Sequence, residues 1–177
     1  MQAGNYTVFM KCGPVGTAGK GTHDHNDQLS VCIYYKEYPL VIDGGTYAYT
    51  FDLSKRNVYR SEKKHSNIVI DKKQQSSLDN NIFAFCADGE GCLETEMPLL
   101  GKYLFTTGEE ISRQVMIDEK GISLIDHWTE NRKGKSQLLC PFHIDSWQRT
   151  DGSHLVLKTS FGLFSFCSDH KYQHCSI

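Results

Sequence analysis

The sequence predicts an all-β protein, a large antiparallel β-sandwich formed by one domain that spans residues 1–177. Three observations support this prediction. Many short segments are rich in β-branched and aromatic residues, and turn signals separate them along the chain. No segment longer than ten residues shows a convincing helical period. The strand-like YTVFMKC follows almost at once after the first residue, so we expect the chain to be a piece of a longer protein.

The segment QLSVCIYY shows the strand pattern most clearly. Leu29, Val31 and Ile33 alternate with more polar neighbours, which is the period of two that places every second side chain on one face. The other predicted strands are YTVFMKC (6–12), YPLVID (38–43), SNIVID (66–71), IFAFCAD (82–88), YLFTT (103–107), ISRQVMID (111–118), GISLIDHW (121–128), QLLCPFHID (137–145), HLVLKTS (154–160) and FGLFSFCSD (161–169). Strands of this length and spacing are typical of a sandwich.

Composition excludes several function classes. The net charge of −2 gives no basic field for nucleic acid, and no apolar run reaches the ~20 residues that cross a bilayer. None of the seven cysteines forms a C-x-x-C pair, which argues against a zinc ribbon or a thioredoxin-like site. Four of them lie in apolar segments and are predicted to be buried free thiols: Cys32, Cys86, Cys140 and Cys167.

Residues with metal-binding chemistry concentrate between positions 19 and 67. Asp43 ends an apolar strand before two glycines, where it could bind a cation or accept backbone N–H groups in the turn. His65 stands just before a predicted strand, and His25 follows His23 in THDHND. Two imidazoles and one carboxylate suit zinc, although unrelated surface histidines would produce the same composition.

A basic segment between Asp52 and His65 is the second candidate site. It is expected to be a loop, either a solvated surface or a subsite for an anionic sugar in which Arg56 or Arg60 forks a carboxylate or sulfate. Tyr59, in the same segment, is a candidate acid–base group because nearby cations can lower the pKa of a tyrosine.

Two blocks in order carry a family resemblance: GKGTHDHNDQLSVCIYYKEYPLVIDGGTYAYT, then RNVYRSEKKHSNIVID. They resemble the C-terminal β-domain of the heparinase II/III-like polysaccharide lyases, and the match is close over about residues 20–70. The resemblance implies that an N-terminal helical toroid completes the enzyme, so that this piece alone would have little activity. It also implies a periplasmic or extracellular location.

The resemblance implies a division of labour in the H-x-H pair. His25, Asp43 and His65 would bind a zinc ion that is chiefly structural, and His23 would face the substrate. A lyase of this class breaks a glycosidic bond next to a uronic acid by β-elimination, which needs a base, an acid and a group that neutralises the carboxylate. Histidine can be the base near neutral pH. The substrate would be an anionic polysaccharide; heparan-type, alginate-type and bacterial capsule glycans all remain open.

Two other function classes stay open. A cupin-like metal enzyme also begins with H-x-H, but the segment HDHNDQLSV offers Asp27 where cupins generally have a glutamate. A non-catalytic acidic-glycan-binding or assembly module would bind without cleaving. A second metal site from His170, His174 and Cys175 is conceivable, although a frayed terminus explains this cluster more simply.

Overall fold

The structure is a computed structural model that divides into two compact units, residues 1–140 and 141–177. It describes residues 1–78, 81, 83–118, 121–129, 132–141, 144–149, 154–159 and 162–167. The conceivable second metal site at 170–175 lies outside the described residues. Among the residues that are described, no helix has both the length and the apolar character needed to span a membrane.

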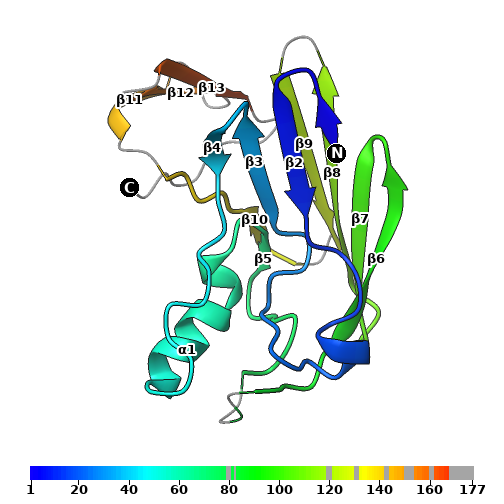
Figure 1. The fold of residues 1–177 in the computed structure, drawn as a ribbon. Coiled ribbons are helices and arrows are strands. Elements are labelled where there is room, and N and C mark those ends of the chain that lie inside the picture. Colours follow the sequence, from blue (N-terminus) through cyan, green and yellow to red (C-terminus); the bar gives the residue numbers. More distant parts are fainter. Residues whose placement is uncertain are drawn as a thin grey trace. The chain divides into compact units, whose positions relative to one another are not determined.

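The first sheet of the larger unit has four antiparallel strands in chain order (Figure 1). They are β1 (Gln2–Ala3), β2 (Tyr6–Met10), β3 (Val31–Tyr35) and β4 (Tyr38–Val41). The register pairs Val8 with Ile33 and Ile33 with Val41, so alternating apolar residues of three strands share one face.

The second sheet is also a four-stranded antiparallel meander. Its strands are β6 (Gly89–Glu96), β7 (Leu99–Phe105), β8 (Glu110–Asp118) and β9 (Gly121–Trp128). Along β8, Ile111, Arg113 and Val115 alternate with more exposed residues and are 2%, 0% and 0% exposed. An arginine therefore lies on the buried face between two apolar residues.

The two sheets pack face to face around an apolar core, as predicted for a sandwich. One buried cluster joins Val8, Val31 and Ile33 of the first sheet with Leu99 and Val115 of the second. A second cluster continues this core below the first sheet, where the loop residue Leu29 and strand β5 (Ile68–Ile70) meet β7 and β8. Strand β5 pairs with β10 (Gly134–Ser136) in a sheet of its own.

The segment after Asp52 is a helix, and the predicted basic loop is wrong. Helix α1 (Leu53–Arg60) begins where the Asp52 side chain accepts a hydrogen bond from the Lys55 N–H at 2.9 Å. A 3-10 turn, η2 (Glu62–Lys64), follows directly. Eight residues give little more than two turns, too short for the periodicity that reveals a helix in sequence.

The smaller unit contains one antiparallel sheet of three strands in chain order. They are β11 (Ile144–Arg149), β12 (His154–Thr159) and β13 (Gly162–Cys167). Strands β12 and β13 lie within the predicted segments 154–160 and 161–169. The predicted strand 137–145 is wrong over most of its length: β11 overlaps it only at 144 and 145, and residues 137–141 form only an isolated bridge at Leu139. A short 3-10 turn, η1 (Thr17–Gly19), completes the described elements of the chain.

Two further sequence predictions need correction. The segment 83–88 contains no strand and forms only an isolated bridge between Ala87 and Ser76. Cys86, in this segment, is exposed, so it is not the buried thiol that its apolar neighbours indicated. Cys32 and Cys140 are half-buried, and the side chain of Cys167 is outside the described part.

Candidate metal centre and adjoining surface

His23 and His25 lie in a loop before β3, and the backbone turns between them. His23 has a φ of 58°, and its N–H donates to the Phe83 carbonyl at 2.7 Å. Gly21 permits this close approach, since a Cβ there would lie 2.1 Å from the Phe85 carbonyl oxygen. As a result His23 is exposed, whereas His25 is only 9% exposed.

His25 and His65 come together from distant segments, as the sequence predicted. Their ring centroids are 5.2 Å apart, and His65 is fully buried at the end of η2. Asp27 joins them: one possible ligand atom from each of the three residues lies within 4.8 Å of the others. Side-chain rotations could bring such atoms to the ~3.3 Å separation of two ligands around zinc.

One nitrogen of His65 lacks a hydrogen-bond partner in the part of the chain that the structure describes. Its Nε2 is buried and makes no hydrogen bond among the described residues, while its Nδ1 lies 2.6 Å from the Asp43 Oδ2. Because Nδ1–H donates to the carboxylate, Nε2 carries a lone pair, which is the tautomer that binds a metal. An orphaned imidazole nitrogen beside a second imidazole and a carboxylate fits a zinc ion.

Asp43 contacts the site through His65. Its Oδ1 accepts the Gly45 N–H at 2.8 Å, as the turn interpretation of the sequence also allowed. Burial acts to raise the pKa of Asp43, but the hydrogen bonds from His65 and from the Gly45 N–H outweigh it and the pKa is lowered. Asp43 thus stays ionised and orients the His65 ring, and direct ligation by Asp43 stays a prediction.

Asp27 is the member of this cluster that sequence analysis missed as a candidate ligand. Burial raises its pKa to about 6, although the ammonium of Lys11, which pairs with both Asp24 and Asp27, opposes the shift. The signal that could have found it is the spacing H-x-D, which follows directly on H-x-H. Metal affinity would then depend on Asp27 being deprotonated.

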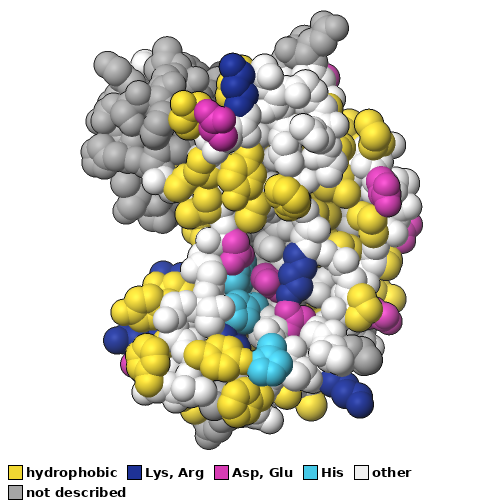
Figure 2. Space-filling model, in the orientation of Figure 1, with side chains coloured by type: hydrophobic (Ala, Val, Ile, Leu, Met, Phe, Trp, Pro, Cys, Tyr) yellow, Lys and Arg dark blue, Asp and Glu magenta, His cyan; other side chains and the backbone are white. Residues whose placement is uncertain are grey.

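An open hollow lies beside these residues. A cavity of about 320 Å³ is lined by Asp27 and Asp43 together with Lys11, Cys32 and the apolar Phe9 and Met10 among others. Figure 2 shows histidine, acidic and basic side chains gathered in a hollow between two apolar areas. Part of the site therefore faces solvent.

Arg56 and Arg60 point into the protein from helix α1, and both are 0% exposed. Nη1 of Arg56 donates to Nε2 of His25 at 3.0 Å, while its Nε and Nη2 have no hydrogen-bond partner among the described residues. Burial lowers the pKa of Arg56, and burial, His65 and Arg56 lower the pKa of His25 to about 4. Arg60 donates to Asn57 at 2.7 Å.

A chain of contacts links Arg56 to the exposed histidine. The guanidinium carbon lies 4.6 Å from the Tyr49 ring centroid, and the Tyr49 hydroxyl bonds to Nδ1 of His23. Phe83 contacts both rings edge-on. Tyr49 therefore connects the buried Arg56 with the exposed His23.

Tyr59 lies in a second aromatic group. Its ring stacks on that of Tyr47 with centroids 5.0 Å apart, and the Lys64 ammonium lies 5.4 Å from its centroid. Tyr47 is 66% exposed. The structure thus places Tyr59 under a cation, as the sequence predicted, but its catalytic role stays a prediction.

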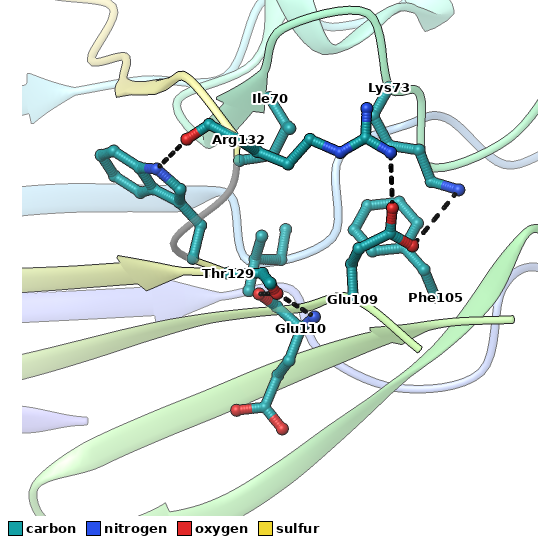
Figure 3. A pocket seen from close by; sticks show the side chains of 9 residues that line it. Ile70, Lys73, Phe105, Glu109, Glu110, Thr129 and Arg132 are labelled. Carbon is teal, nitrogen blue, oxygen red and sulfur yellow. Dashed lines mark hydrogen bonds and ion pairs between the residues drawn. The ribbon is translucent and has the colours of Figure 1, made fainter. Parts of the chain in front are cut away.

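A second cavity carries no comparable chemistry. Figure 3 shows it between Ile70, Phe105 and the ion pairs that Glu109 makes with Arg132 and Lys73. Its volume of about 10 Å³ is close to that of a single water, so it is a packing feature and not a ligand site.

Comparison with known proteins agrees with the resemblance in the sequence. No curated protein matches the chain. The family described as heparinase II/III-like, C-terminal, matches residues 1–171, which includes every residue of the candidate metal centre. The chain therefore belongs to the heparinase II/III-like C-terminal domain family.

Proposed function

We propose that this domain is the metal-containing β part of a polysaccharide lyase that cleaves uronic-acid-containing glycans by β-elimination outside the cytoplasm. Family membership supports the lyase class. The observation that carries the proposal is the convergence of His25, Asp27 and His65 around an orphaned imidazole nitrogen, next to an exposed His23. An N-terminal helical domain would form the other wall of the cleft.

The metal would be a zinc ion held by His25, His65 and Asp27, with Asp43 as the partner that orients His65. Ligation by His25 would replace the hydrogen bond that its Nε2 accepts from Arg56 in this structure. When bound, zinc supplies a positive charge that ties the loop before β3 to the entrance of β5. This role is structural, as the resemblance implied. His23 lies in the same loop, two residues before His25. Loss of the zinc ion would therefore also displace His23.

His23 is the proposed base. Its Nδ1 bonds to the Tyr49 hydroxyl, and when Nδ1–H donates to that oxygen, Nε2 carries the lone pair that removes a proton. The proton in question is on C5 of the uronic acid, alpha to the carboxylate. Tyr49 would fix the ring orientation and the tautomer, as a hydrogen-bonded partner does for other catalytic histidines.

Arg56 is the proposed contact for the substrate's negative charge. A buried guanidinium without an anionic partner is costly, and two of its nitrogens lack partners among the described residues. A carboxylate or sulfate reaching Arg56 past Tyr49 would satisfy them. Tyr59 would protonate the leaving oxygen, and Arg60, which packs 5.5 Å from the Phe85 ring centroid, would support the same subsite.

The test uses the intact protein with a panel of acidic polysaccharides, and it measures the ultraviolet absorbance of the unsaturated product. We expect product from at least one uronate polymer, and its loss in His23→Ala. His127→Ala is the matched control because His127 is an exposed histidine on β9. Binding without unsaturated product from any polymer would reject the lyase and favour the non-catalytic glycan-binding module.

A further inference from the structure

The two histidines of the candidate metal centre lie in segments without a strand of their own. His25 is in the loop before β3, and His65 follows the 3-10 turn η2. Direct bonds join these segments: the Val31 N–H donates to the Ser66 carbonyl at 3.0 Å, and the Asn67 side chain donates to the Asn26 carbonyl at 3.0 Å. These bonds join the two segments to each other. Other contacts must fix the segments against the second sheet.

Arg113, on β8 of the second sheet, reaches both segments. Its Nη1 donates to the Leu29 carbonyl at 2.9 Å and to the Ser66 carbonyl at 2.6 Å. Leu29 is four residues after His25, and Ser66 is the residue after His65. One nitrogen atom therefore holds the backbone of both histidine-bearing segments.

The Arg113 guanidinium is itself fixed. Asp126 lies directly opposite in the β8–β9 register and accepts from Nε at 2.8 Å and from Nη2 at 2.7 Å. Nη2 also donates to the Ser136 hydroxyl at 3.2 Å. All five N–H donors are thus used, and the Arg113 side chain is 0% exposed. A guanidinium whose donors are all used is held in one orientation. Arg113 therefore fixes the segments that contain Leu29 and Ser66 relative to β8.

We propose that Arg113 is a positioning residue for the metal centre. Beside the direct bonds between the two segments, its Nη1 bridges the Leu29 and Ser66 carbonyls, so it helps to set the separation of His25 and His65 while it anchors both segments to the second sheet. The inference rests on the proposed zinc site. The inference assigns to Arg113 a function beyond stability. Arg113 contacts neither the side chains of the proposed metal ligands nor the substrate. Asp126 acts through Arg113 by orienting it.

The experiment separates this role from stability. A buried ion pair can often be replaced by apolar residues with little loss of stability, whereas removal of one partner is strongly destabilising. The double variant Arg113→Met/Asp126→Leu should therefore be more stable than Arg113→Met alone, yet it lacks both donors to the Leu29 and Ser66 carbonyls. Val115→Ala is the control: Val115 is two residues away on the same face of β8 and 0% exposed.

The intact proteins are stripped of metal, their urea unfolding is recorded, and zinc affinity is measured by competition with a chromophoric chelator. We expect the double variant to bind zinc about 10- to 100-fold more weakly than wild type, the range for lost outer-shell support. Val115→Ala should lose stability and keep its zinc affinity. Wild-type affinity in the double variant would overturn the positioning role alone. Absence of zinc binding in the wild type would overturn the metal site, and the role of Arg113 with it.

Discussion

The two aspartates near the metal centre should differ in their effect on zinc affinity. Asp27 contributes one of the three clustered ligand atoms, whereas Asp43 bonds to His65 at 2.6 Å and acts through its ring. We therefore compare Asp27→Asn with Asp43→Asn. Both changes remove one negative charge and preserve side-chain size, so a difference between them reflects geometry and not overall charge.

The expected magnitudes follow from these positions. Loss of an outer-shell carboxylate costs about 10- to 100-fold in metal affinity, or about 1.4–2.7 kcal/mol. Asp43→Asn should fall in that range, since an asparagine oxygen can still accept from His65 Nδ1. Asp27→Asn removes an anionic ligand and should exceed it. The amide oxygen can still accept from Lys11, so the neighbouring ion-pair cluster is only weakened.

Zinc affinity is measured on the intact protein by chelator competition at a temperature where circular dichroism shows that each metal-free variant is folded. His127→Ala is again the control, and it should bind zinc as wild type does. The reasoning is refuted if Asp43→Asn weakens zinc binding as much as Asp27→Asn or more. In that case Asp43 would be the third ligand, as the family resemblance implied.

Three further outcomes are expected. His23→Ala should keep zinc affinity and thermal stability while lyase activity of the intact protein falls by about 10²- to 10⁴-fold, the contribution of a general base; loss of zinc would contradict the division of labour. Cys86 should react with a thiol reagent in the native protein before Cys12, because Cys86 is exposed and burial raises the pKa of Cys12 to about 11; mass spectrometry of partly labelled protein would show the reverse order if this is wrong. Gly21→Ala should lower the free energy of unfolding. The φ of 62° alone costs a non-glycine residue about 1–3 kcal/mol, and the clash of the new Cβ with the Phe85 carbonyl oxygen adds to this. An unchanged urea midpoint would disprove the close contact between Gly21 and Phe85.

Much of the candidate site could be predicted because its chemistry depends on residue type. Two histidines and an aspartate next to strand ends indicate a metal ligand set wherever those ends meet. The structure confirms that His25 and His65 meet. It also brings in Asp27, since the loop before β3 curves so that the aspartate at the end of H-x-H-x-D reaches the same cluster. Spacing alone cannot show that curvature.

The orientation of the basic segment could not be predicted. A run of lysines and arginines normally indicates a solvated surface, and the sequence was interpreted as a loop. The structure forms helix α1, in which Arg56 and Arg60 are four residues apart and share the buried face. Contacts with His25, Asn57 and the Tyr49 and Phe85 rings offset part of the cost of that burial.

The sequence by itself determined the all-β class, several of the strands and the residue types of the site, because a period of two and the donor atoms of histidine and aspartate are local properties. The strand GISLIDHW was predicted with its observed bounds, and the face-to-face sheets follow from alternating apolar residues. Only the tertiary structure decided which carboxylate joins the histidines, where His23 points, and that Arg113 holds both loops. These depend on backbone torsions such as the positive φ of His23 and on contacts between residues up to 84 positions apart. No local pattern encodes such contacts, because they exist only after the two sheets have packed.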